Sequence, residues 1–182
     1  MKNFERNIVL IGFMGTGKSS AGKALAKKTG RALVDIDQRV EEKEKRRIAD
    51  IFEKDGEAAF RRLEKEAIRE AVKGSGLVIT TGGGAVLDPE NLSALKAGGV
   101  VVALEATPET IFQRVKDSRH RPLLKSNDVL GEIRRLLESR RPYYRKADVV
   151  VSTDGKTALQ VADEIAAKLE GGEEFEFGKD WF

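Results

Sequence analysis

The stretch NIVLIGFMGTGKSS, residues 7–20, is the most informative part of this 182-residue chain about its fold. It begins with an uninterrupted β-rich apolar run at 7–11. The pattern G-x-x-x-x-G-K-[ST] follows at Gly12, Gly17, Lys18 and Ser19. In such a loop, glycines let backbone N–H groups point at phosphate oxygens, and the next helix adds its dipole. The stretch therefore predicts a strand, a phosphate-binding loop (P-loop) and a helix.

The P-loop predicts a nucleoside triphosphate as ligand, with Lys18 on its β- and γ-phosphates and Ser19 on Mg²⁺. The loop does not say what is done with that nucleotide, because GTPases, ATPases, small-molecule kinases and nucleotide-gated binding modules share it. A guanine-reading N-K-x-D motif is absent from the sequence. The sequence therefore disfavours a GTPase.

Four further apolar runs alternate with helical stretches along the chain. The expected strands are 7–11, 32–36, 76–80, 99–104 and 147–153; the expected helices cover 17–29, charged material to about 71, 89–97, a stretch opened by the cap Thr107 and Pro108, and 156–169. Unbroken apolar strands separated by helices favour a parallel sheet covered on both faces. We expect a three-layer α/β/α domain with a five-stranded parallel sheet over residues 1–169, followed by a tail at 170–182.

The composition favours a globular protein of the cytoplasm. Hydrophobic residues make up 40% and charged residues 35% of the chain, and cysteine is absent. No apolar run approaches the roughly 18 residues of a membrane span. The body has few aromatic residues, so we expect no nucleic-acid partner. The acidic tail holds four aromatic residues, including the only Trp, and either lacks order or docks on the basic body or a neighbour.

Two acidic residues, Asp35 and Asp37, stand at the end of the second expected strand. In a continuing strand they share one face at the carboxyl edge, where open α/β sheets bind ligands. One carboxylate can then orient Mg²⁺ through water while the other orients an acceptor hydroxyl. The alternative is that Asp37 caps the helix that follows it.

Three arginine segments are candidates for binding an anion. Arg61 follows Glu57 and precedes Glu64 at helical spacing, so either carboxylate can hold its guanidinium. Arg121 lies before Pro122 in the segment 116–128, which has the composition of a lid that closes over phosphates. Arg140 and Arg141 precede Pro142, and one of them can grip a carboxylate. The alternative for each arginine is solvated surface charge.

The strand-like stretch VITTGGGAVL, residues 78–87, runs into Gly82, Gly83 and Gly84. Three glycines in a row leave no side chain on this part of the sheet edge. Such a run indicates that some group approaches the backbone closely here.

Taken together and in order, these segments resemble the shikimate kinase family from residue 7 to about 168. The resemblance rests on GFMGTGKSS, DIDQRVEE, IADIFEKDGEAAFRRLE, TTGGGAVL, RPLL and ESRRPYYRKADVVVST. It implies a P-loop kinase fold and phosphorylation of the shikimate 3-hydroxyl by ATP with Mg²⁺, in chorismate and aromatic amino-acid biosynthesis. It also implies a monomer.

The resemblance further implies a role for each matching residue. Asp37 holds and deprotonates the attacking hydroxyl, within acceptor-binding helices at about 37–72. Arg121 neutralises charge on the transferred group, and Lys18 is the third catalytic residue. The remaining roles are shikimate binding by Asp37, Arg61, Gly82, Gly83, Gly84 and Arg140; nucleotide binding by Gly12, Gly15, Thr16, Gly17, Lys18, Ser19, Ser20, Arg114 and Arg121, with Arg114 and residues 152–157 at the adenine; and metal support by Ser19 and Asp35.

The sequence departs from the family pattern in two places. The stretch EEKEKRRIADIF, residues 41–52, lacks a glycine near the turn between the acceptor-binding helices, and the tail has no counterpart. A shifted helix at this turn would tilt Arg61. The alternative functions are another small-molecule kinase, such as gluconate kinase, and a non-catalytic ATP-dependent module.

Overall fold

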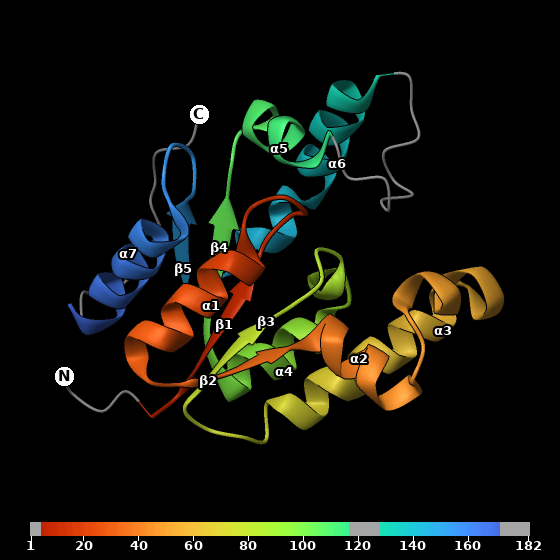
Figure 1. The fold of residues 1–182 in the computed structure, drawn as a ribbon, viewed down its shortest axis with the longest axis horizontal. Coiled ribbons are helices and arrows are strands. Elements are labelled where there is room, and N and C mark those ends of the chain that lie inside the picture. The colour runs from red at the N-terminus through yellow and green to blue at the C-terminus, as the bar shows by residue number, and fades with distance from the viewer. Residues whose placement is uncertain (1–4, 117–127, 172–182) are drawn as a thin grey trace.

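The central feature of the fold is a parallel five-stranded sheet in the order β2-β3-β1-β4-β5 (Figure 1). The structure, a computed structural model, describes residues 5–116 and 128–171. The strands are β1 Asn7–Ile11, β2 Ala32–Asp35, β3 Leu77–Thr80, β4 Gly99–Glu105 and β5 Val149–Ser152. All four neighbouring pairs run parallel, which confirms the predicted sheet.

The strand β1 occupies the centre because it is apolar on both faces. All five of its residues are buried, and Ile8 pairs with Val78 on one side and Val100 on the other. Continuous apolar runs are typical of strands that are covered by helices on both faces.

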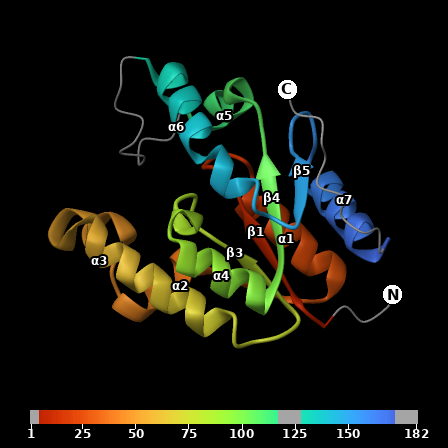
Figure 2. The same cartoon turned by 180° about the vertical axis from the view of Figure 1, so that it is seen from behind.

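Helices cover both faces of the sheet (Figures 1 and 2). One core contains residues of α1 and α7, and a separate core on the other face contains residues of α3, α4, α5 and α6. The helices are α1 Lys18–Thr29, α2 Ile36–Glu44, α3 Ile48–Ala71, the short 3₁₀ helix η1 Ala85–Leu87, α4 Pro89–Gly98, α5 Pro108–Val115, α6 Val129–Tyr144 and α7 Ala158–Glu170. The α/β/α layering is therefore confirmed.

The element boundaries differ most from the prediction after β2. The charged stretch to residue 71 forms two helices, because Lys45 adopts a left-handed conformation (φ 52°) at the end of α2. The helix α3 is in turn bent at Gly56 (φ 82°, ψ 170°). The predicted cap of α5 is confirmed, since the Thr107 side chain accepts a hydrogen bond from the Thr110 N–H.

The amino edge of the sheet is fastened by one buried side chain. The Asn7 amide donates to the carbonyl oxygens of Gly74 (2.8 Å) and Gly98 (3.0 Å), and its oxygen accepts from the Leu77 N–H (3.0 Å). These bonds tie the start of β1 to the start of β3 and to the end of α4. The loops at the opposite, carboxyl edge are left to build a site.

Two predicted segments lie largely outside the described residues. Residues 117–127 hold most of the expected lid together with Arg121, and residues 172–182 hold most of the expected tail. Within the described ranges, no helix is long and apolar enough to cross a membrane.

Candidate active site

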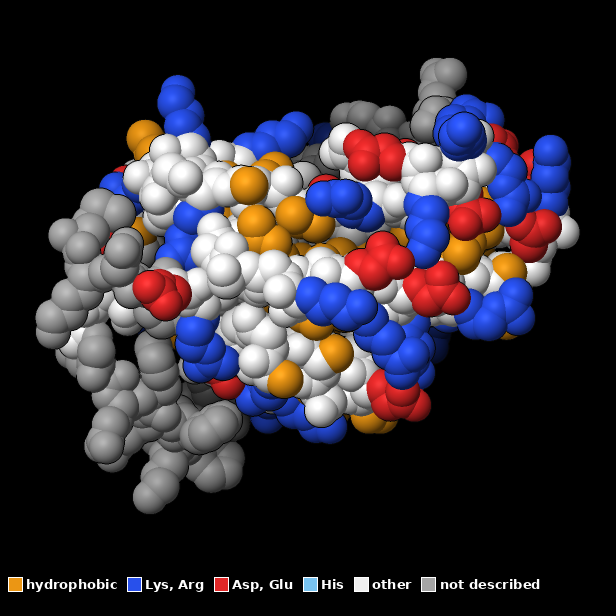
Figure 3. Space-filling model, turned by 90° about the horizontal axis from the view of Figure 1, so that it is seen from below, with side chains coloured by type: hydrophobic (Ala, Val, Ile, Leu, Met, Phe, Trp, Pro, Cys, Tyr) orange, Lys and Arg blue, Asp and Glu red, His pale blue; other side chains and the backbone are white. Residues whose placement is uncertain are grey.

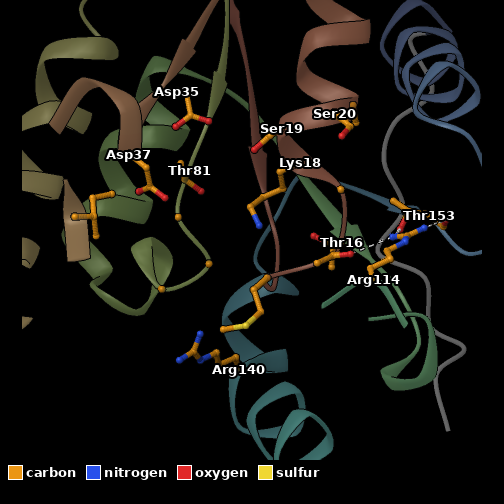
Figure 4. Close-up of a pocket in the computed structure, with 18 of the residues that line it drawn as sticks. Thr16, Lys18, Ser19, Ser20, Asp35, Asp37, Thr81, Arg114, Arg140 and Thr153 are labelled. Atoms are coloured by element: carbon orange, nitrogen blue, oxygen red, sulfur yellow. Dashed lines mark hydrogen bonds between the residues drawn. The ribbon is translucent and has the colours of Figure 1, made fainter. Parts of the chain in front are cut away.

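A cavity of about 830 Å³ opens at the carboxyl edge of the sheet (Figure 4). Figure 4 shows Lys18 in the middle, Asp35 and Asp37 on one side of it, and Arg114 and Thr153 on the other. Of the predicted site residues that the structure describes, those that line the cavity are Gly15, Thr16, Gly17, Lys18, Ser19, Ser20, Asp35, Asp37, Arg61, Gly82, Gly83, Gly84, Arg114 and Arg140. Gly12 lies behind this lining.

The P-loop has the backbone conformation that its glycines predict. Gly12, Gly15 and Gly17 all have positive φ angles, and a Cβ on Gly12 would lie 2.3 Å from the Leu104 carbonyl oxygen. The Lys18 ammonium donates to the carbonyl oxygens of Gly12 (2.8 Å) and Phe13 (2.9 Å). Lys18 therefore sits inside the loop that begins α1, where a helix N-terminus favours an anion.

Asp35 ends β2 and caps α2. One of its carboxylate oxygens accepts from the Gln38 N–H (3.1 Å), and the other accepts from the Thr80 hydroxyl on β3 (2.7 Å). The prediction that Asp35 and Asp37 share the face of a continuing strand is therefore wrong. Since the Asp35 side chain caps the helix, Ile36 begins it and Asp37 lies in its first turn. The alternative that Asp37 is the cap is also wrong, yet both carboxylates reach the cavity.

The carboxylates of the half-buried Asp37 and the buried Glu64 lie side by side. Asp37 Oδ1 and Glu64 Oε1 are buried without a hydrogen-bond partner among the described residues. Both oxygens lie within 3.0 Å of the point that a Cβ on Gly82 would occupy. Burial raises the pKa of Asp37 to about 6, the Glu64 and Asp35 charges raise it too, and Lys18 and Arg61 oppose the rise. Burial also raises the pKa of Glu64, against the opposing charge of Arg61.

Arg61 is fixed by both carboxylates that the helical spacing predicted. Its Nε and Nη2 donate to Glu57 Oε1 at 3.2 and 3.0 Å, and its Nη1 donates to Glu64 Oε2 at 2.7 Å. The Glu64 side chain is fully buried, so this ion pair is shielded from water on one side. The alternative of a solvated surface arginine is therefore wrong for Arg61.

The three glycines after β3 make room for the side chains of the site. A Cβ on Gly82 would press on Asp37 and Glu64, and a Cβ on Gly84 would lie 2.6 Å from Arg61 Nη2. A Cβ on Gly83 would lie 3.2 Å from the Met14 nitrogen of the P-loop. The close approach that the glycine run indicates thus includes the carboxylates and the guanidinium of the protein itself.

The helix α6 contributes Arg140 and Tyr144. Arg140 lines the cavity with its guanidinium carbon 5.4 Å from the centre of the Phe13 ring, whereas Arg141 pairs with Glu138. The buried Tyr144 hydroxyl donates to the Gly83 carbonyl oxygen at 2.7 Å. Burial raises the pKa of Tyr144 to about 12, with Arg140 opposing the rise, so the hydroxyl stays a donor at neutral pH.

At the other end of the cavity, Arg114 joins two segments that are distant in the sequence. Its guanidinium donates to the Gly15 carbonyl oxygen at 3.1 Å and to the hydroxyl and carbonyl oxygens of Thr153, each at 2.9 Å. Thr153 and Lys156, from the predicted segment 152–157, also line the cavity. This end therefore offers a flat guanidinium beside the P-loop, as a nucleotide base requires.

The donor set suits Mg²⁺ better than a transition metal. Ser19 and Asp35 supply a hydroxyl and a carboxylate at the cavity, and Mg²⁺ takes such oxygen ligands together with waters and substrate phosphates. Among the residues that the structure describes, no group of three His, Cys, Asp or Glu side chains could hold a metal by itself. Waters and a bound phosphate would supply the remaining ligands of a metal held by Ser19 and Asp35.

Among the residues that the sequence did not reveal are Thr81, which lines the cavity, and Thr80 and Tyr144, which bond to residues of the lining. Tyr144 lies four residues after Arg140, so the helical spacing places both on one face and could have pointed to it. Thr80 bonds Asp35 because β2 and β3 are neighbours in register. That contact depends on strand order, which no local pattern reveals.

Comparisons with known proteins agree with this geometry. A family profile described as Shikimate kinase matches residues 14–170. The Shikimate kinase of Persephonella marina is 46% identical over 164 residues, which are 90% of this chain and 99% of that protein. The match therefore spans all the segments that line the cavity.

Among solved structures, shikimate kinases resemble this chain in sequence and fold, whereas other small-molecule kinases resemble it in fold alone. The shikimate kinase of Acinetobacter baumannii, solved in complex with shikimate, has a TM-score of 0.89 and 36% identity, over 93% of this chain and 96% of that one. A gluconokinase of Sinorhizobium meliloti covers 94% of this chain and 99% of its own, with a TM-score of 0.54 and 18% identity. That second likeness shows the fold alone.

Proposed function

The chain belongs to the shikimate kinase family, and from this premise we propose that it transfers the γ-phosphoryl group of ATP to the shikimate 3-hydroxyl, releasing shikimate 3-phosphate and ADP. One observation carries the proposal. A single cavity holds a P-loop, a carboxylate that does not cap a helix (Asp37), and two arginines on the acceptor side. The product would serve the synthesis of chorismate and aromatic amino acids.

ATP would lie across the P-loop half of the cavity. Gly15, Thr16, Gly17 and Ser20 offer backbone and hydroxyl groups to the phosphates, and Lys18 offers a positive charge. Arg114 would stack on the adenine, because its three hydrogen bonds hold its plane fixed beside Gly15 and Thr153.

Asp37 is proposed to accept the hydrogen bond of the attacking hydroxyl and to take its proton as the phosphoryl group is transferred. A carboxylate with a pKa of about 6 is mostly ionised at pH 7.5, yet it is a stronger base than an ordinary aspartate. Its Oδ1 is buried beside Glu64 and Gly82, so the other carboxylate oxygen, Oδ2, is the acceptor proposed for this role. Positioning and electrostatic stabilisation supply most of the catalysis in phosphoryl transfer.

Shikimate is proposed to lie against the glycine run with its carboxylate between Arg61 and Arg140. Guanidinium groups bind carboxylates through paired, charge-assisted hydrogen bonds. Arg61 is held by two glutamates and Arg140 by the Phe13 ring, so little side-chain entropy is lost on binding. Arg121, which the resemblance assigns to the transferred phosphoryl group, lies outside the described residues.

We also propose that Ser19 holds Mg²⁺ directly and that Asp35 supports it through water. Bound there with ATP, the ion would neutralise charge on the β- and γ-phosphates. Asp35 is already oriented by Thr80 and by the α2 backbone, which suits a supporting role. We further propose a monomer, since one chain supplies every described part of the site, and a cytoplasmic enzyme with access to ATP.

The test is ADP release from ATP with Mg²⁺ in the presence of shikimate, quinate, gluconate or no acceptor. We expect release with shikimate alone. Release with gluconate would show that the acceptor pocket takes a different acid, and ATP binding without release for any acceptor would indicate a non-catalytic module. Either result contradicts the proposal.

A further inference from the structure

A second cavity, of about 430 Å³, lies between α4 and the carboxyl-terminal end of α6. Its floor is apolar, and it shares no lining residue with the active site. We call it the α4–α6 groove. Its apolar members are Val86, Pro89, Leu92 and Tyr143, and its cationic members are Lys96, Arg145 and Lys146.

The cations of the groove are only partly neutralised. Lys96 pairs with Asp148 at 2.9 Å. Lys146 lies 5.6 Å from the centre of the Tyr143 ring and makes no ion pair with any carboxylate that the structure describes. Within residues 5–116 and 128–171, the Arg145 guanidinium makes no ion pair. The groove therefore combines an apolar floor with an uncompensated positive rim, and its occupant should be both aromatic and acidic.

The sequence of this chain contains one segment with that chemistry. Residues 172–182, GEEFEFGKDWF, hold four acidic residues, four aromatic residues and one lysine. Acidic and aromatic residues alternate from Glu174 to Phe177. Such alternation lets aromatic side chains face an apolar floor while carboxylates meet a basic rim.

The segment can reach the groove from the end of α7. Figure 2 shows α7 on one side of β5 and the end of α6 on the other, and β5 is an edge strand. Eleven extended residues span at most about 36 Å, whereas a helix layer is roughly 10 Å thick. The exposed Val150 on β5 leaves apolar surface on the way. Figure 3 views the molecule from the amino ends of the strands, where exposed apolar side chains lie among Lys, Arg, Asp and Glu side chains.

We propose that residues 172–182 bind the α4–α6 groove of their own chain, with aromatic side chains on the apolar floor and carboxylates against Arg145 and Lys146. This docking does not depend on the proposed function. It covers apolar surface and neutralises the rim.

Trp181 is the only tryptophan of the chain, so its fluorescence reports on this segment alone. In the intact protein without ligands, we expect emission at shorter wavelength, and severalfold weaker iodide quenching, than in a free peptide of residues 172–182. Both signals should move to the peptide values in the double variant Arg145→Glu/Lys146→Glu and in about 1 M salt. Lys23→Glu, an exposed lysine on α1, is the control and should leave both signals unchanged.

Four results would overturn the proposal. Trp181 could match the free peptide in the intact protein, or stay shielded in the double variant. The shift could depend on protein concentration, which would indicate docking on a second copy. It could also vanish with ATP or shikimate, which would place the segment in the active-site cavity. Circular dichroism of the double variant checks that it is folded.

Discussion

At the residue scale, the ionised form of Asp37 is destabilised in the free protein, because the carboxylate is largely removed from water and lies near Glu64 and Asp35. Its pKa of about 6 exceeds the usual 3.8, so the native state holds its proton more tightly than the unfolded chain. Folding stability therefore falls as the pH rises from about 4 to 6 and stays lowered above it. A shift of roughly two units is worth about 3 kcal/mol at most.

We therefore predict that Asp37→Asn lowers the activity of the protein and raises its stability. Turnover should fall by orders of magnitude while ATP binding is retained, because the base is lost and the P-loop is untouched. Without ligands, the free energy of unfolding of the variant should exceed that of the wild type by about 1–3 kcal/mol at pH 8. The difference should be smaller at pH 5. Urea denaturation at both pH values measures this. Near-normal turnover would show that Asp37 does not accept the proton of the attacking hydroxyl.

Tyr144 is expected to act as a positioning residue for the acceptor pocket. In Tyr144→Phe the ring still packs, but the Gly83 carbonyl oxygen loses its donor. We predict a KM for shikimate raised by roughly 3–10-fold, as for one hydrogen bond of about 1 kcal/mol, with the KM for ATP little changed.

The adjacent Tyr143→Phe is the matched control for that variant, since no hydrogen bond of the Tyr143 hydroxyl is found among the described residues. Equal changes in both KM values, or the same effect from Tyr143→Phe, would mean that Tyr144 only stabilises the fold.

At the scale of elements, the turn between α2 and α3 carries local strain. Lys45 is exposed and is the described non-glycine residue with a positive φ. The family resemblance expects a glycine near this turn, and the chain forms the turn without one. Arg61 still reaches the cavity, because Gly56 bends α3 before it.

We predict that Lys45→Gly stabilises the protein by about 0.5–1 kcal/mol. The left-handed conformation costs a non-glycine residue roughly 1–2 kcal/mol, and the greater freedom of glycine in the unfolded chain offsets part of the gain. Arg62→Gly, at an exposed position inside the second half of α3, should instead cost about 1 kcal/mol. Urea denaturation of both variants measures the change in their free energy of unfolding. Equal losses would show that Lys45 is not strained.

At the scale of the whole molecule, stability and function are concentrated at opposite edges of the sheet. The Asn7 side chain fastens the amino edge through three hydrogen bonds and is fully buried. The active-site cavity occupies the carboxyl edge. Changes at one edge should therefore leave the other largely intact.

Asn7→Ala should lower the free energy of unfolding by about 3–5 kcal/mol, because two carbonyl oxygens and one N–H lose their buried partner. Both KM values should stay near wild type at temperatures where the variant is folded. Ser75→Ala, at an exposed position of the same edge, is the control and should be neutral. A large rise in either KM would show that the two edges are coupled.

The sheet, the P-loop, the cap of α5 and the Arg61 ion pairs could all be predicted from the amino-acid sequence. Each of these depends on local spacing, which apolar periodicity or helical geometry expresses directly. The strand order, the turn at Lys45 and the helix that begins at Ile36 were not predictable in this way. Strand order depends on long-range pairing. The start of α2 depends on the hydrogen bonds that the Thr80 hydroxyl and the Gln38 N–H donate to Asp35 and not to Asp37.

The contacts between the residues of the site depend on the three-dimensional fold. Glu64 faces Asp37 across Gly82, Tyr144 reaches Gly83, and Arg114 joins Gly15 to Thr153. These contacts link segments that are distant in the sequence, so no local pattern records them. They exist because parallel strands bring their following loops to one edge, where packing of the helices fixes the side chains.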